Sequence, residues 1–249
     1  MHVLRVVFRI DFPSVCTKYI DRMGTAIEIL HSDDEEFWNN ITATPNSQTY
    51  TGYFKSPGEE FRDLTFSPTT LSGSIEFLAG GIPGKQLLSS DPFEGMSKRL
   101  NNFFREFEVT KVARAGIRFY VSEKVIPHAR DIPTSINENM HPDISKIVSA
   151  EMGKISDYAA LYEGVDEDEL EYRLTFGPLH KEDCDKIFQF GREADVIRFQ
   201  ELGYNMIYDI DLYERNFSIK ELSEITKWSR SKLKKATNVV HALKQEAEG

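Results

Sequence analysis

The chain has 249 residues, of which 40% are hydrophobic and 28% charged, and this balance excludes an intrinsically disordered protein. Its 40 acidic against 30 basic residues give a net charge of −10, which argues against a protein that coats nucleic acid but leaves room for a local basic patch. Two cysteines are too few for a secreted disulfide scaffold, and no apolar run approaches the roughly 20 residues that span a membrane, so we expect a cytoplasmic protein without a membrane partner.

The first half predicts a strand, a helix, several strands and a second helix. Apolar residues alternate with polar ones over 4–11, which is typical of a half-buried strand. Apolar spacings of three and four then indicate a helix over 14–30. Runs rich in Thr and aromatic residues predict strands at 48–54, 61–67 and 71–79, and Asp91-Pro92 indicates the start of a helix that ends near 106.

The second half repeats this order. RAGIRFYV, residues 114–121, alternates as a strand does, and the proline-containing segment 125–143 predicts a loop. The remaining predicted elements are a short helix at 143–153, strands at 155–163, 169–177 and 204–214, a short strand or loop at 181–191, and a long helix from Ser218.

We therefore predict an α+β fold of mainly antiparallel sheet with packed helices and a long C-terminal helix. The two arginine-bearing strands start 109 residues apart, at Arg5 and Arg114. This offset suggests two similar β-α-β-β-β-α units, one over 1–109 and one over 110–249. The alternative is that both halves form one compact domain.

Charged residues recur on one side of several predicted strands. Residues i and i+4 of a strand point to the same face, so the arginines of each pair share a face. If the strands are neighbours, one sheet face carries a lattice of arginines and carboxylates. The candidate binding residues of this lattice are Arg5, Arg9, Arg114, Arg118, Arg173, Asp209 and Asp211.

Two interpretations of this lattice stay open. The charges can pair across strands on a solvated face, each pair contributing about 0.2–1 kcal/mol. Alternatively, the arginines can present paired donors to a carboxylate or phosphate ligand.

The segment KWSRSKLKK, residues 227–235, is the one basic island of the sequence. It either docks on nucleic acid or an acidic partner, or forms the solvated face of the long helix. Its basic residues are Lys227, Arg230, Lys232, Lys234 and Lys235.

Patterns that would indicate a catalytic or metal site are missing from the sequence. GGIPGKQ, residues 80–86, has the wrong spacing for a phosphate-binding loop and lacks its Ser or Thr. The six histidines are scattered, and neither H-E-x-x-H nor C-x-x-C occurs. We therefore predict no metal, no cofactor and no catalytic residues, although a chemistry assembled from distant segments stays open.

Five segments occur in an order that resembles a known family. They are VVFRIDF at 6–12, LTFSPTTLSGS at 64–74, ARAGIRFYV at 113–121, YDIDLY at 208–213 and FSIKELSEI at 217–225. The order is similar to that of a sporadically distributed, uncharacterised prokaryotic family that shares a conserved hypothetical domain. The chain departs from it at Ser122-Glu123, where the family usually has an Asn-Arg pair, and in its tail. The resemblance implies no activity, cofactor or catalytic residue, and the family's patchy distribution suggests defence-associated genes.

Three hypotheses for function follow. The first is a non-enzymatic interaction or regulatory subunit of a prokaryotic complex, connected with phage defence, whose partner is another protein or a second copy. The second is an enzyme that acts on a small ligand or a phosphodiester at the Arg/Asp-lined sheet face. The third is a nucleic-acid-binding accessory protein that uses the basic helix. We favour the first because the sequence holds no catalytic constellation.

Overall fold

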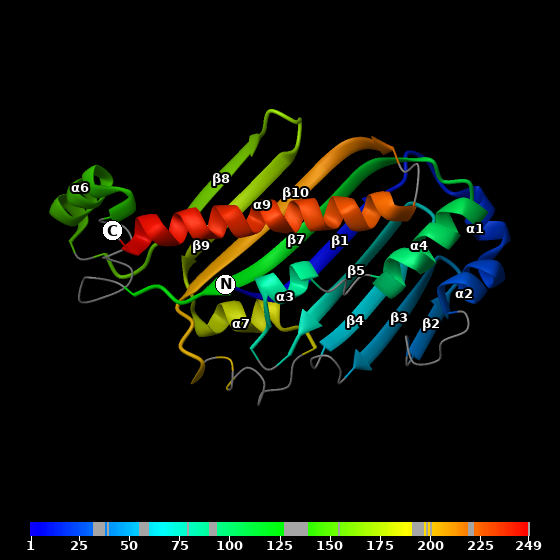
Figure 1. Cartoon of the computed structure of the whole chain (residues 1–249), viewed down its shortest axis with the longest axis horizontal. Helices are drawn as coiled ribbons and strands as arrows, with labels where there is room; N and C mark the ends of the chain where they lie inside the picture. The colour runs from blue at the N-terminus through cyan, green and yellow to red at the C-terminus, as the bar shows by residue number, and fades with distance from the viewer. Residues whose placement is uncertain are drawn as a thin grey trace.

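The computed structural model describes residues 1–31, 38, 40–54, 60–78, 80–89, 94–126, 139–153, 155–190, 197, 199, 201–218 and 222–248. It confirms the α+β class: antiparallel strands form one sheet, helices pack on it, and a long helix ends the chain (Figure 1).

The strands are β1 (His2–Asp11), β2 (Asn40–Thr44), β3 (Ser47–Phe54), β4 (Glu60–Phe66), β5 (Thr70–Phe77), β6 (Ile82–Pro83), β7 (Lys111–Glu123), β8 (Ala160–Val165), β9 (Glu171–Pro178) and β10 (Met206–Ser218). The helices are α1 (Thr17–Asp21), α2 (Met23–His31), α3 (Gly84–Ser89), α4 (Glu94–Glu106), α6 (Pro142–Met152), α7 (Lys181–Ile187) and α9 (Leu222–Glu248).

The sheet has the strand order β2-β3-β4-β5-β1-β7-β10-β9-β8, with β6 added to β1. Its central pair joins β1 to β7, and so it joins the two predicted units across the boundary at 109/110. The sheet is therefore continuous over both halves of the chain, and the division into two similar units stays a prediction.

The two halves nevertheless place their strands in the same way. In each half the first strand is innermost, and the chain then runs to the outer edge and returns strand by strand to pair with it. Phe8 lies opposite Ile117, Arg9 opposite Gly116, and Val7 opposite Arg118. Arg118 follows Arg9 by the same 109 residues that separate Arg114 from Arg5. The central pairing is thus symmetric about the Phe8–Ile117 pair, as a local two-fold axis requires.

One face of the sheet is covered by helices. Buried residues of α9, Leu233, Ala236 and Val240, pack with Ile117 of β7 and Ile210 of β10. Helices α1, α2 and α4 cover the first half of the sheet on the same side (Figure 1). The alternation of the sequence arises because every central strand turns one set of side chains into this layer.

On the opposite face, the described residues that cover part of the sheet come from α7 and from Phe188 and Phe199 after it. Cys184 and Ile187 of α7 are buried against Leu4 of β1, beside Tyr120 and Ile207. The prediction of a strand or loop at 181–191 was wrong in this segment. Five of the seven residues of this helix are charged, so its sequence shows no apolar periodicity that would mark the two residues it buries.

Other predicted elements lie close to those observed, but three observed elements, β2, β6 and α3, were not predicted. Strand β2 is short and mostly exposed, and β6 has only two residues, so neither has the buried apolar run by which the longer strands were predicted. The predicted helix start at Asp91-Pro92 lies outside the described residues, as does most of the loop at 125–143. Among the helices of the described ranges, none is both long and apolar enough to cross a membrane.

Candidate functional site

The strands that carry the seven predicted binding residues are neighbours, and those residues share the sheet face opposite α9. Arg118 of β7 pairs in register with Asp211 of β10, which pairs with Arg173 of β9. Two residues further along β7, Tyr120 lies between Arg5 of β1 and Asp209 of β10, its partners on the two neighbouring strands. We call this surface the charged face.

Arg118 and Asp209 form a bidentate ion pair on the charged face. The Arg118 Nε donates to Asp209 Oδ1 at 2.6 Å, and its Nη2 donates to Oδ2, so the contact is bidentate. The guanidinium lies 4.9 Å from the centre of the Tyr120 ring. The hydrogen bonds that Arg118 donates to Asp209 raise the pKa of Arg118 above its usual value.

Arg114 and Asp211 form a looser pair. Their Nη2 and Oδ2 atoms are 3.9 Å apart, and the Arg114 guanidinium stacks 4.0 Å from the centre of the Tyr213 ring. Burial raises the pKa of Asp211, against the opposing effect of Arg114 and Arg118.

The remaining three arginines have local partners. Arg9 bonds to Asp11 of its own strand at 2.8 Å, and Arg173 Nε lies 3.4 Å from Glu163 of β8. Arg5 is only 6% exposed and donates to the carbonyl of Ile187, the last residue of α7, and to Gln189 after it. The geometry thus divides the predicted set into Arg5, which is buried, and six residues that reach the surface.

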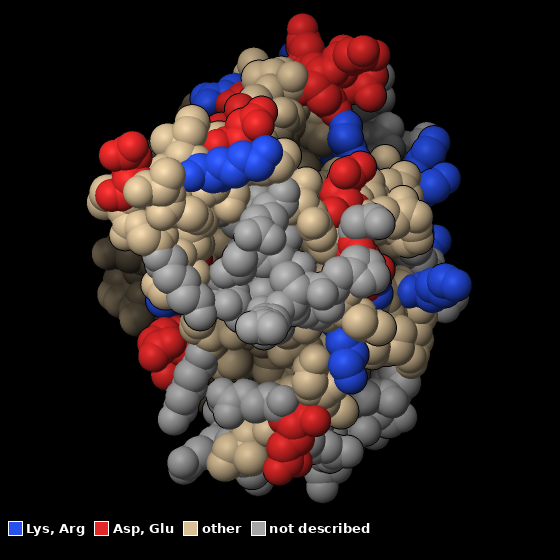
Figure 2. Space-filling model, turned by 90° about the vertical axis from the view of Figure 1, so that its left-hand side faces the viewer, with Lys and Arg blue, Asp and Glu red and all other residues tan. Residues whose placement is uncertain are grey.

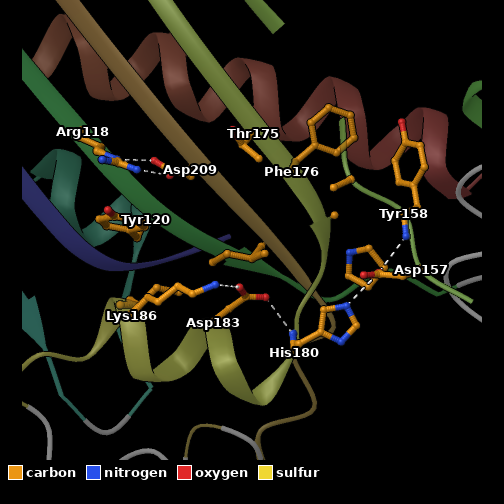
Figure 3. A pocket seen from close by; sticks show the side chains of 15 residues that line it. Arg118, Tyr120, Asp157, Tyr158, Thr175, Phe176, His180, Asp183, Lys186 and Asp209 are labelled. Atoms are coloured by element: carbon orange, nitrogen blue, oxygen red, sulfur yellow. Dashed lines mark hydrogen bonds and ion pairs between the residues drawn. The ribbon is translucent and has the colours of Figure 1, made fainter. Parts of the chain in front are cut away.

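A pocket of about 330 Å³ opens between the charged face and α7. Figure 3 shows Arg118 and Asp209 on the sheet side and α7 below them. Arg114 and Asp211 lie outside its lining. The charged residues that line it are Arg118, Asp157, His180, Asp183, Lys186 and Asp209.

Two polar contacts hold the α7 side of this pocket. His180 Nε2 lies 2.9 Å from Asp157 Oδ1, and the His180 amide donates to Asp183 Oδ2 at 3.1 Å. The hydrogen bond to Asp157 raises the pKa of His180, and nearby carboxylates add to this effect against partial burial. Lys186 Nζ lies 3.5 Å from Asp183 Oδ1.

Four of the pocket's charged residues were not predicted: Asp157, His180, Asp183 and Lys186. They come from connecting segments, which carry no periodic signal, and only the folded topology brings them to the charged face. Within the described part of the chain, no group of three or more His, Cys, Asp or Glu side chains is arranged to hold a metal ion.

The basic island on α9 is divided by the packing of the helix. Lys232 is 9% exposed and pairs with Glu214 of β10, while Lys235 pairs with Asp166 in the β8–β9 turn. Lys227, Arg230 and Lys234 are exposed. Two of the five cations of the predicted patch therefore hold α9 to the sheet.

Exposed apolar side chains occur on α6 and on the edge strand β8 at one end of the sheet. We call this surface the α6–β8 end. A hydrogen-bond contact of 3.3 Å between His141, which precedes α6, and Tyr162 of β8 joins the two elements. Its exposed apolar residues are Ile144, Ile147, Val148 and Met152 on α6 and Leu161 and Val165 on β8.

Comparison with known proteins gives no further guide to function. No family model, curated protein or solved structure matches the chain.

Proposed function

We propose that the protein is a non-enzymatic interaction subunit that associates through its α6–β8 end. The observation that supports this function is the inverted burial of α6. Its apolar residues have the three- and four-residue spacings of a helix that packs on a core, yet Ile147 is 64% exposed and Met152 is 83% exposed. Ser145 is the buried residue of this helix. An exposed apolar stripe such as the one formed by these α6 residues is typical of a helix that packs on a partner.

The edge of the sheet at this end supports the same proposal. β8 is the last strand in the sheet order and pairs with β9. Edge strands of stable monomers are usually protected by charge or by a cover. β8 carries one charge, Glu163, which lies beside Arg173, and it exposes Leu161 and Val165 on either side of that charge. The opposite edge strand, β2, exposes polar residues instead.

The occupant that we propose is a second copy of this chain. Two β8 strands can pair antiparallel about a two-fold axis, which extends the sheet and brings the two α6 helices to one interface. Figure 2 shows this end of the molecule, with acidic side chains gathered at the top, where the tip of the β8–β9 hairpin lies. Antiparallel pairing places the two acidic tips at opposite ends, so they do not repel each other across the interface.

The family resemblance supplies the cellular setting of the proposal. We place the assembly in the cytoplasm of a prokaryote, within a defence-associated complex. The support is the order of the five resembling segments and the absence of a catalytic pattern in the sequence.

The oligomeric state of the purified full chain tests the proposal. We expect a dimer by size-exclusion chromatography with light scattering. We expect Ile147→Glu to shift it to monomer, because a buried charge on the stripe opposes association. Ile20→Glu is the matched control, since Ile20 is 48% exposed on α1, far from the α6–β8 end, and this variant should stay dimeric.

A wild-type chain that is monomeric at high micromolar concentration would contradict the proposed self-association. Dissociation of both variants, or of neither, would show that the contact lies elsewhere. Circular dichroism of each variant checks that the fold is kept.

A further inference from the structure

The ion pairs of the pocket between α7 and the charged face leave particular polar atoms available. Arg118 uses Nε and Nη2 to bind Asp209, which leaves Nη1 without a hydrogen bond among the described residues. Asp157 accepts from the Tyr158 amide and from His180 with the same oxygen, Oδ1. Its Oδ2 is bonded to no described residue. The pocket thus offers a cationic donor and an anionic acceptor at the same time.

These two groups lie on opposite sides of the pocket. Figure 3 shows Arg118 on the strands at one side and Asp157 on the connecting segment at the other. Ile187, Ile207 and the Tyr120 ring line the space together with them. A ligand that reaches both groups therefore needs its charges separated by an apolar or neutral body.

The charge balance of the lining argues against a simple anion or cation. Three carboxylates, Asp157, Asp183 and Asp209, face two permanent cations, Arg118 and Lys186, and His180. A multiply charged anion such as a phosphate would meet the repulsion of these carboxylates, and a lone cation would meet Arg118 and Lys186. Opposite charges at the two ends of one ligand match both sides.

We propose that this pocket binds a small zwitterion of dipeptide size, with its carboxylate on Arg118 and its ammonium group on Asp157. The volume of about 330 Å³ lies at the lower end of the range of small-molecule sites. Lys186, whose side chain is 75% exposed, adds positive charge near the carboxylate. This site is independent of the α6–β8 end, and its failure would leave the proposed self-association untouched.

Isothermal titration calorimetry with glycyl-leucine tests the site on the full chain. We expect saturable binding of glycyl-leucine. We expect N-acetyl-glycyl-leucine and glycyl-leucinamide, each of which lacks one charge, to bind at least about tenfold more weakly. Asp157→Asn should weaken the binding of glycyl-leucine by a similar factor, because it removes the anionic acceptor. The variant keeps a carbonyl oxygen that can accept from Tyr158 and His180. Asp168→Asn, in the β8–β9 turn outside the pocket, is the matched control and should bind as the wild type does.

Several results would overturn the proposal. One is the absence of saturable binding at millimolar dipeptide. Another is equal affinity for the dipeptide and its acetylated form, which would show that Asp157 does not hold the ammonium group. A third is binding of inorganic phosphate that displaces the dipeptide and is unchanged in Asp157→Asn, because this would define an anion site only.

Discussion

Arg5 is the arginine of the charged face that the fold buries. Its Nη1 donates to the carbonyl of Ile187 at 3.3 Å, and its Nη2 donates to Ser74 Oγ at 3.1 Å and to Gln189 Oε1 at 2.8 Å. Ser74 in turn donates to Asp63, whose pKa is raised by burial and lowered in part by Arg5. Arg5 thus ties β1, β5 and the end of α7 together, and it holds one wall of the pocket.

Replacement of Arg5 tests this structural role. We expect Arg5→Met to lower the free energy of unfolding by about 3 kcal/mol, because it leaves the buried Asp63 without its nearby cation and Gln189 without its donor. Arg9→Met, the control on the same strand, should change it by no more than about 0.5 kcal/mol, since Arg9 is exposed and pairs within β1. Urea unfolding at neutral pH measures both, and equal losses would contradict the assignment.

At the scale of single elements, the attachment of α7 depends on pH. The contact with Asp157 raises the pKa of His180 above 6.5. For a group whose pKa is raised by folding, the stabilisation is complete below about 6.5, the unfolded value, and is lost as the pH rises through the folded value. The ion pair at the start of α7 should therefore weaken as the pH rises through the folded-state pKa of His180.

An NMR titration of the His180 ring checks this prediction. We expect a midpoint above 6.5 in the wild type, and in Asp157→Asn a midpoint that returns toward 6.5. An unchanged His180 midpoint in the variant would show that Asp157 is not the cause.

Helices and strands can be predicted from the sequence where buried residues recur at regular spacing. They cannot be predicted where an element is held by a few irregularly spaced contacts. β1, β7, β9 and β10 each have one covered face, so alternation in the sequence marks them, and the shared face of Arg118 and Asp209 follows from the same alternation. α7 could not be predicted, because its anchoring side chains are two buried residues in a charged segment. The pocket could not be predicted either, since Asp157 and His180 lie in connections whose path depends on the whole fold.

For the whole molecule, the central β1–β7 pair decides how the chain unfolds. Separation of residues 1–109 from 110–249 would expose the paired edges of both strands and the core between α9 and the sheet. We expect a single cooperative thermal transition with equal calorimetric and van't Hoff enthalpies. Two separate transitions would show that the halves are independent domains, and differential scanning calorimetry distinguishes these outcomes.

The local two-fold relation of the central strands also has an evolutionary consequence. β4 connects to β5 through residues 67–69, whereas the corresponding connection from β9 to β10 takes residues 179–205 and carries α7. The pocket beside α7 therefore lies at the long connection of the second half, whereas the short connection of the first half carries no helix. Because both connections lie away from the central β1–β7 pair, one can stay minimal while the other accepts insertions, and selection can then act on the longer connection without disturbing the paired strands at the centre.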